Sequence, residues 1–532
     1  VIEKRIYFHV FLDLAPDMIV DDQSEVIAFL DQPGSFGPDT SEVQRLDTHG
    51  AAIFLAGDYA YKMKRAVYFE YMDFSTLDRR QDCCQAEVRL NARTAPDIYL
   101  DVVAVTRQAD GNLALAGTGE SVEWLVRMRR FAQSDILDKV ALRGEFDETL
   151  ALKVADMACD FFATSKIYLD ADASDSIPDI VAETARLLPD GIGSIYTQAE
   201  VNELCDRQHA TTQALLAPLK QRRREGFVRH CHGDFHLRNI CLYKGEPTLF
   251  DAIEFNDRLA ISDVLYDLSF LLMDLLHRDL REPTNLILNR YLEHTGDYDG
   301  ILLLRLYLSV RGGIRAFTAI PAALNQSDAE VADRISRDAK NYLALACDFL
   351  KSAAPQLVAI GGLSGSGKST QAKKLAPKLG AAPGAIILRS DVVRKSLMGV
   401  ATSSTLDAGG YSAEVTAQVY QFLRTKAAML LTAGHSVIVD AVHARAEERQ
   451  MIEAVAARSG VPFKGLWLAP PGDVMEARLE TRHNDASDAT VEILHQQQSY
   501  DLGEMTWTEL PSAEDRDETA GAISKVIDQV FD

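Results

Sequence analysis

Residues 362–369 read GLSGSGKS, a glycine-rich segment that ends in a lysine and a hydroxyl side chain. An apolar run, LVAI, precedes it, and a helix-forming stretch, STQAKKLAPKLG, follows it. In this context the glycines allow backbone N–H groups to surround phosphate oxygens at the amino end of a helix. A glycine-rich turn without a ligand is the alternative, but it does not explain the strand before and the helix after. The pattern therefore predicts a nucleotide triphosphate site, with ATP as the nucleotide.

The residues expected to hold this nucleotide lie in one short run. Lys368 would reach the β- and γ-phosphates, and the Ser369 hydroxyl would bind Mg²⁺. The full set expected to contact ATP is Gly362, Ser364, Gly365, Ser366, Gly367, Lys368, Ser369 and Thr370.

Charged residues farther along the chain indicate what this site does with ATP. Asp391 and Arg394 follow an apolar run, where an aspartate can accept a hydroxyl proton and an arginine can hold an anionic acceptor. Asp440 ends the run SVIVD and is a candidate Mg²⁺ carboxylate, which either binds the ion directly or contacts one of its ligands. Arg478 and Arg482 lie one helical turn apart, as the cations of a closing lid would. Exposed arginines are usually only solvated, but these elements in this order favour a small kinase over a motor or a switch GTPase.

A second segment, HGDFHLRN at 232–239, has the residue types of a different catalytic loop. Asp251 follows it in TLFDAIEFN, at the end of an apolar run. This order is typical of a catalytic loop and a metal-binding aspartate that are separated by a β-hairpin. Asp234 would accept the proton of the acceptor hydroxyl, while Asn239 and Asp251 would hold Mg²⁺ on the phosphates. His232 and His236 are interpreted as groups that structure the loop rather than as metal ligands.

The partners that such a loop needs lie upstream. Lys62 is on a predicted strand and Glu87 on the helix after it, and a strand lysine paired to a helix glutamate orients the α- and β-phosphates. Lys64 lies on the same face of that strand, so it is an alternative to Lys62. Leu125 to Met128, in EWLVRMRRF, fall where a linker between two lobes would bond the adenine through its backbone.

The elements around these residues form two patterns. Up to about residue 130 the sequence predicts strands and one prominent helix, which opens with a capping box at Ser75 and Asp78 and runs to about Arg93. From 135 to 350 helices dominate, interrupted at 228–256 by short apolar runs. After KSAAPQ at 351–356 the strands LVAI, AIILRSD, SVIVD and GLWLAP alternate with helices. That alternation predicts a parallel sheet of βαβ units, so we expect domains at 1–354 and 355–532.

Composition limits the remaining classes of function. The chain has 532 residues, more than one hydrophobic core usually supports, with 47% hydrophobic and 25% charged residues. Its formal net charge of −23 disfavours nucleic acid and anionic membranes as partners. No apolar run is long enough to cross a membrane, no secretion signal is recognisable, and the scattered cysteines form no CxxC pair. We therefore expect a cytoplasmic protein with reduced thiols.

The C-terminal motifs resemble those of the small P-loop kinases that include gluconate kinases, zeta toxins and polynucleotide 5′-kinases. The resemblance covers residues 356–500 and is carried by GGLSGSGKST, RSDVVR, VIVDAVHARAEER and RLETRHNDASDA. It implies Asp391 as the base that activates the acceptor, and Arg478 with Arg482 as the lid pair. The segment at about 395–412 does not select one member of this group.

The first ~350 residues resemble the aminoglycoside phosphotransferase superfamily, protein-kinase-like enzymes that act on small molecules. HGDFHLRN, FDAIEFN and the Lys62/Glu87 pair carry the resemblance, and YMDFSTLDRR with LNARTAPDIYL suggests a bacterial branch often fused to a P-loop kinase. No G-x-G-x-x-G loop covers the phosphates, only LAGDYAY, and no resistance-specific residue set is present. The expected fold class is therefore two domains, α+β and α/β: a bilobal protein-kinase-like fold with lobes at about 20–130 and 131–350, then a P-loop fold with a parallel sheet flanked by helices.

Three hypotheses of function follow. The leading one is a bifunctional ATP-dependent phosphotransferase that uses Mg²⁺ and transfers phosphoryl groups to hydroxyls of small molecules at both sites. A second makes the N-terminal domain a regulatory pseudokinase that controls a single active P-loop kinase. A third makes the C-terminal domain a polynucleotide 5′-kinase, and the negative net charge argues against it.

Overall fold

The computed structural model describes residues 20–48, 50–69, 72–170, 177–352, 354–401, 404–406, 408–481, 487–511 and 516–531. Within them the chain divides into two compact units. Unit 1 comprises the described residues up to Lys153, Asp160–His277 and Leu303–Leu350. Unit 2 comprises Val154–Cys159, Arg278–Leu302 and the described residues from Lys351 onward. The domain limits at 1–354 and 355–532 remain a prediction. The two units differ from them because Val154–Cys159 and Arg278–Leu302 belong to unit 2.

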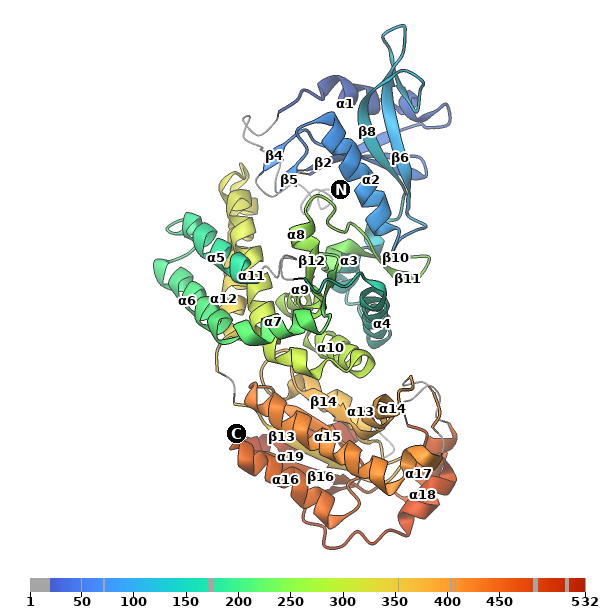
Figure 1. The fold of residues 1–532 in the computed structure, drawn as a ribbon, viewed down its shortest axis with the longest axis vertical. Coiled ribbons are helices and arrows are strands. Elements are labelled where there is room, and N and C mark those ends of the chain that lie inside the picture. The colour runs from blue at the N-terminus through green and yellow to red at the C-terminus, as the bar shows by residue number, and fades with distance from the viewer. Residues whose placement is uncertain are drawn as a thin grey trace. The chain divides into compact units, whose positions relative to one another are not determined.

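Unit 1 contains a six-stranded antiparallel sheet ordered β1-β2-β3-β8-β6-β7. Its strands are β1 (Val43–Asp47), β2 (Ala51–Ala56), β3 (Tyr59–Lys64), β6 (Tyr99–Arg107), β7 (Leu113–Leu115) and β8 (Glu120–Arg129). Because side chains alternate along a strand, one face packs Phe54 and Met63 near helix α1 (Ser24–Leu30), and the other packs Ala60 and Val126 near helix α2 (Leu77–Asn91). Figure 1 shows α2 lying along β6 and β8. This packing fixes the strand that carries Lys62 relative to the helix that carries Glu87.

The start of α2 differs from the prediction. Thr76 is the N-cap, and its hydroxyl accepts a hydrogen bond from Arg79 N. Ser75 instead donates its hydroxyl to Asp73 Oδ1. The predicted capping box at Ser75 and Asp78 was wrong because Thr76, not Ser75, is the last residue with extended backbone before the helix begins.

The remainder of unit 1 is mainly helical around two short antiparallel strand pairs. β9 (Val228–His230) pairs with β12 (Ile261–Asp263), and β10 (Ile240–Tyr243) pairs with β11 (Glu246–Leu249). The HGDFHLRN segment joins β9 to β10, and Asp251 follows β11, so a hairpin separates the two as the sequence predicts. The other elements here are β4 (Tyr68–Phe69), β5 (Met72–Asp73), α3 (Leu137–Leu142), α4 (Glu148–Thr164), α5 (Ile177–Leu187), α6 (Gln198–Ala214), α7 (Leu216–Arg224), α8 (Asp257–Ala260), α9 (Val264–His277), α11 (Ile301–Leu324) and α12 (Ala329–Phe349).

Unit 2 is built on a five-stranded parallel sheet ordered β14-β15-β13-β16-β17. Its strands are β13 (Leu357–Gly361), β14 (Ile386–Arg389), β15 (Val437–Asp440), β16 (Phe463–Leu468) and β17 (Thr508–Leu510). The helices that follow the strands are α13 (Lys368–Leu375), α14 (Ser390–Leu397), α15 (Ala413–Thr432), α16 (Ala446–Ser459), α17 (Gly472–Glu480), α18 (Val491–Gln498) and α19 (Arg516–Phe531), and α10 (Arg281–Thr295) joins them from earlier in the chain.

The core of unit 2 explains the alternation of strands and helices in its sequence. Side chains on one face of the sheet, such as Val358 and Ile438, pack with Ala372 of α13 and Ile527 of α19. Helices α15 and α16 contact the strands as well, and Figure 1 shows them running along the sheet. The β13, β14 and β15 strands are buried throughout, as parallel strands covered on both faces must be. The predicted fold class, with a kinase-like region and a P-loop fold, is confirmed.

Two expectations from composition concern the whole chain. None of the described helices combines the length and the apolarity that crossing a bilayer requires. The seven cysteines all lie within the described residues, none of them forms a disulfide, and five are buried.

Candidate active sites

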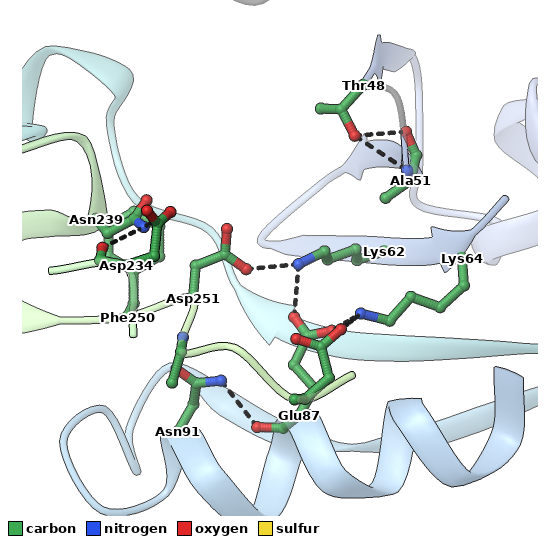
Figure 2. A network of polar contacts seen from close by, with 12 residues as sticks. Thr48, Ala51, Lys62, Lys64, Glu87, Asn91, Asp234, Asn239, Phe250 and Asp251 are labelled. Atoms are coloured by element: carbon green, nitrogen blue, oxygen red, sulfur yellow. Dashed lines mark hydrogen bonds and ion pairs between the residues drawn. The ribbon is translucent and has the colours of Figure 1, made fainter. Parts of the chain in front are cut away.

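The first site forms in unit 1 around a strand lysine. Lys62 Nζ, on β3, lies 2.8 Å from Glu87 Oε1 on α2 and 2.6 Å from Asp251 Oδ1 (Figure 2). Burial lowers the pKa of Lys62, but the carboxylates of Asp251 and Glu87 outweigh it and raise that pKa well above the ordinary value. Lys62 is therefore a permanent cation at a point where three elements meet.

Lys64, the alternative to Lys62, has a different environment. Its Nζ contacts Glu87 Oε2 and Glu254 Oε1, and its side chain is only 2% exposed. Lys62 is 12% exposed and reaches Asp251, whose side chain is 42% exposed. Both lysines thus share Glu87, but only Lys62 extends to the solvent-accessible carboxylate. This arrangement favours Lys62 as the phosphate-binding lysine and Lys64 as a buried counter-ion.

The catalytic loop brings Asp234 and Asn239 together. Asn239 Nδ2 donates to the Asp234 backbone carbonyl at 2.9 Å and to its Oδ2 at 2.8 Å. His236 Nε2 lies 3.2 Å from the same Oδ2. Burial raises the pKa of Asp234, but His236 together with His232 and Arg315 outweighs it and holds that pKa far below the ordinary value. Asp234 is therefore an ionised carboxylate, ready to accept a proton or a hydrogen bond.

Buried polar groups hold the HGDFHLRN loop in place through hydrogen bonds. Asp267, on α9, accepts hydrogen bonds from the backbone N–H groups of His232 and Gly233, each at 2.9 Å. His232 donates through Nε2 to Phe250 O at 2.9 Å, and burial lowers its pKa, so it is a neutral structural group. Arg311 Nη1 donates to Gly233 O at 3.2 Å. These contacts agree with the interpretation of His232 as a loop-structuring residue.

Two residues predicted to contact adenine lie inside a strand. Leu125 pairs with Met63 of β3 and Val103 of β6, and Met128 pairs with Ala60 and Tyr99. Both residues are inside the central strand β8, where the ladder uses their backbone groups. The chain leaves the sheet only after Arg129, so the linker begins later than the sequence predicts, and contact of Leu125 and Met128 with adenine stays a prediction. The apolar run itself gives no sign of where the strand ends.

The oxygen atoms of this site suit a hard divalent cation. Asn239 uses its Nδ2 for Asp234, so its Oδ1 remains as a ligand atom, and Asp251 supplies carboxylate oxygens. Among the described residues no group of three or more His, Cys, Asp and Glu side chains could hold a metal. Mg²⁺ at nucleotide sites usually takes one or two protein oxygens and completes its shell with phosphates and water. The residues present therefore fit a nucleotide-bound Mg²⁺.

The second site lies at the carboxyl ends of the parallel strands in unit 2, where open α/β sheets bind ligands. Gly367, the N-cap residue of α13, has a φ of +93°, and Gly365 has a φ of +79°. A side chain at Gly365 would meet Met475 O at 2.6 Å, so only glycine fits there. Lys368 Nζ donates to Gly362 O at 2.8 Å and Leu363 O at 2.9 Å. The loop thus has the wrapped backbone that a triphosphate cradle requires.

The metal-binding residues predicted for this site lie side by side. Ser369 Oγ donates to Asp440 Oδ2 at 2.6 Å, and Arg389 Nε is 3.5 Å from the same oxygen. Burial raises the pKa of Asp440, although Arg389 and Lys368 lower it. A bound cation would offset that burial, so Ser369 and Asp440 fit an Mg²⁺ site.

A cavity of about 1620 Å³ extends from this loop. Lys368, Ser369, Asp391 and Arg394 line it, as does Arg478. Arg478 Nη1 approaches the Gly365 and Ser366 carbonyls at 3.4 Å, so α17 places one lid cation at the loop.

The other two arginines predicted to be catalytic are Arg394 and Arg482. Arg394 Nη1 donates to Gly410 O at 2.8 Å and to Thr416 Oγ1 at 3.2 Å, so it also holds the chain before α15. Arg482 lies outside the described residues. Of the two arginines predicted to form the lid pair, the structure therefore describes only Arg478.

Several residues of these sites were not found from the sequence. Asp488 accepts hydrogen bonds from Lys395 Nζ and Leu406 N, each at 2.9 Å, and from Tyr411 OH at 3.1 Å. Gln497 accepts one from Ser364 N at 2.8 Å. Both residues approach the site through folding. Asp488 lies within RLETRHNDASDA, but the motif gave it no role, and no motif marks Gln497.

Comparisons with known families agree with this geometry. Residues 165–304 match the model described as the phosphotransferase enzyme family, and residues 357–501 match the model described as an AAA domain. Both resemblances predicted from the sequence are confirmed. With a kinase-like domain and a P-loop domain, the chain is an ATP-dependent kinase.

Relatives and solved structures are similar over different lengths. Uncharacterized proteins of Mycobacterium bovis and Mycobacterium tuberculosis are 29% identical over 461 residues, which cover 84% of this chain and 88% of theirs. Aminoglycoside 2′-phosphotransferase-IIIa in its GDP complex is 15% identical, over 60% of this chain and 99% of its own, with a TM-score of 0.38. The APS kinase of Mycobacterium tuberculosis with AMPPNP and APS is 23% identical, over 33% of this chain and 98% of its own, with a TM-score of 0.25.

Proposed function

We propose that this kinase is bifunctional, with two separate Mg·ATP sites that each transfer the γ-phosphoryl group to a hydroxyl of a small molecule. The observation that carries the proposal is the presence of two separate sets of phosphate-handling residues in one chain. Unit 1 has Asp234 with Lys62 and Asp251, and unit 2 has Lys368 with Asp391.

In unit 1 the ionised Asp234 would accept the proton of the acceptor hydroxyl as that oxygen attacks the γ-phosphorus. Lys62, held by Glu87, would bind the α- and β-phosphates as a fixed cation. Asn239 and Asp251 would hold Mg²⁺, which neutralises phosphate charge when bound. The hydrogen bonds from the loop backbone to Asp267 keep Asp234 in place, so the base needs little rearrangement.

In unit 2 the P-loop backbone and Lys368 would surround the β- and γ-phosphates, and Ser369 with Asp440 would hold Mg²⁺. Asp391 would accept the hydroxyl proton on the far side of the γ-phosphate. Arg478 already contacts the loop, so it would stabilise the charge of the transferring group.

The size and charge of the molecule favour a small acceptor. Pockets for one small ligand are usually about 300–1,000 Å³, so a cavity of about 1620 Å³ has room for a nucleotide and a second small molecule. The net charge of −23 disfavours a polynucleotide acceptor. Two kinases in one chain would favour transfer of an intermediate between sites, or two phosphorylations of one metabolite.

The test is a metabolite-extract screen with γ-labelled ATP. Wild type, Asp234→Asn, Lys368→Ala and the double variant are compared by mass spectrometry for phosphorylated products. The proposal predicts that each single variant loses one class of product and that the double variant loses both. If Asp234→Asn loses nothing, unit 1 is a regulatory pseudokinase. Labelling of a 5′-hydroxyl oligonucleotide that disappears in Lys368→Ala would instead make unit 2 a polynucleotide kinase.

A further inference from the structure

Helix α10 contributes side-chain amides to the edge of the unit 2 sheet. β14 is an edge strand, and Asn289 of α10 meets its free side. Asn289 Oδ1 accepts a hydrogen bond from Ile387 N at 2.7 Å, and its Nδ2 donates to Ala385 O at 3.2 Å. Asn285 Nδ2 also donates to Ala385 O, at 3.0 Å. These amides take the hydrogen bonds that a neighbouring strand would otherwise make.

Both asparagines are almost fully buried, at 2% and 5% exposure. An edge strand that is buried without such partners would leave backbone N–H and C=O groups without hydrogen bonds, which destabilises the fold. Farther along the same segment, Asp299 Oδ1 lies 2.6 Å from Lys426 Nζ on α15. The segment from α10 to Asp299 is therefore an integral part of unit 2, although the sequence places it within the phosphotransferase family match.

One turn beyond Asn289, the same helix places a carboxylate beside the P-loop site. Glu293 Oε1 lies 3.2 Å from Arg389 Nη1, and both side chains are less than one-tenth exposed. The other side of that guanidinium, Nε, is 3.5 Å from Asp440 Oδ2. Asp440 in turn accepts the hydrogen bond from Ser369 Oγ. A continuous line of charged and polar contacts thus runs from α10 to the residues that fit Mg²⁺.

We propose that Glu293 is a positioning residue of the P-loop site, acting through Arg389 on Asp440. This inference rests on the proposed Mg·ATP function of unit 2. Glu293 balances the charge of Arg389 and sets its distance from Asp440. Without the Glu293 charge, Arg389 interacts more strongly with Asp440, and the positive charge that Glu293 balanced acts on the cation. The site then requires more Mg²⁺, whereas binding of metal-free ATP changes little.

The test measures Mg²⁺ dependence of nucleotide binding in the full chain. A fluorescent ATP analogue is titrated at a series of Mg²⁺ concentrations, and the signal of Lys368→Ala is subtracted to remove binding in unit 1. We expect Glu293→Gln to raise the half-saturating Mg²⁺ concentration severalfold. Glu282→Gln, an exposed acid on the same helix, is the matched control and should leave it unchanged. Glu293→Gln combined with Arg389→Gln should bring the Mg²⁺ requirement back toward the wild-type value.

A purely structural role gives a different result. In that case Glu293→Gln lowers the unfolding temperature but has the same Mg²⁺ requirement as Glu282→Gln, which overturns the inference. Asn289→Ala provides the comparison, since it should destabilise unit 2 without changing the Mg²⁺ requirement of the folded protein. If wild type and Lys368→Ala bind the same amount of analogue, the proposed function of unit 2 fails, and the inference fails with it.

Discussion

Lys62 Nζ, on a strand of the six-stranded sheet, lies 2.6 Å from Asp251 Oδ1, which follows the hairpin β10–β11. The two residues are far apart in sequence, so their contact joins the strand lobe of unit 1 to its helical lobe. A lysine there can hold phosphates, and an aspartate beside it can hold the cation that accompanies them. The ion pair thus brings together the two charges that a bound nucleotide would need.

The two lysines of β3 should respond differently to the same substitution. Lys62→Met removes the cation that reaches Asp251, so phosphoryl transfer by unit 1 should fall roughly 100-fold, as when a single transition-state donor is lost. Lys64→Met leaves the buried carboxylates of Glu254 and Glu87 with less compensation, so it should lower the unfolding free energy by roughly 3 kcal/mol. Denaturant unfolding and ADP production, both in a Lys368→Ala background, measure the two effects. Equal loss of activity without loss of stability in Lys64→Met would assign the phosphate role to Lys64.

The pH dependence of unit 1 should reflect the contact between His236 and Asp234. The folded-state pKa of Asp234 is depressed, so the carboxylate stays ionised until the pH falls far below the ordinary value, and its contribution is lost only there. Activity of the Lys368→Ala protein should therefore not decline near pH 5 through protonation of Asp234. His236→Gln removes the largest opposing cause, so the acid limb of kcat/KM should move to higher pH. The exposed His209→Gln is the control, and an unmoved acid limb in His236→Gln would contradict the assignment.

Asp488 should control acceptor binding in unit 2. Its carboxylate joins Lys395 on α14 to Leu406 N and Tyr411 OH, and Tyr411 lines the cavity, as do the two neighbours of Asp488 in sequence, Ser487 and Ala489. Asp488→Asn weakens these charge-assisted hydrogen bonds, so the KM for the acceptor should rise roughly tenfold while the KM for ATP changes less. Steady-state kinetics with the product identified in the extract screen checks this. Asp473→Asn, at an exposed position, is the control and should behave as wild type. An equal rise in the KM values for acceptor and ATP would show that Asp488 stabilises the fold rather than the acceptor site.

Stability of unit 2 should fall in acid because of His443. Burial, with Lys368 and Arg449, lowers the pKa of His443 to about 3. An unfolded chain binds this proton near pH 6.5, so stability is complete above that pH and declines as the pH falls from there toward 3. At pH 5 the loss should be about 2 kcal/mol. His443→Gln removes this titrating group, so the unfolding free energy of unit 2 should fall by about 2 kcal/mol less between pH 7.5 and pH 5 than in wild type.

Tryptophan fluorescence isolates this effect to unit 2. The chain has three tryptophans, and Trp467 and Trp507 lie in unit 2, with the Trp507 ring 5.0 Å from the ring of His443. In a Trp124→Phe background the signal therefore reports unit 2 alone. An equal loss of stability in acid with and without His443 would refute the assignment.

The sequence could predict those site residues that belong to motifs of fixed spacing. The Lys62/Glu87 pair and the Asp234/Asn239 pair follow from the elements that carry them, and the structure brings each pair into contact. The P-loop residues Lys368 and Ser369 follow from local glycine pattern in the same way. Such motifs are readable because one strand, one loop and one helix set their geometry.

Other residues depend on contacts that no local pattern encodes. Glu254 meets Lys64 only after the lobes of unit 1 pack, and Glu293 meets Arg389 only because α10 covers the edge of β14. The short strand β17 has three residues and no periodicity to reveal it. The end of β8 at Arg129 was not predictable for a related reason, since Leu125 and Met128 are apolar whether a strand continues or ends.

The most direct test of two separate sites is the number of nucleotides bound per chain. Isothermal titration with a non-hydrolysable ATP analogue and Mg²⁺ should give two per wild-type chain. Lys368→Ala and Lys62→Met should each give one, and the double variant none. One nucleotide per wild-type chain, or two in Lys368→Ala, would contradict the account.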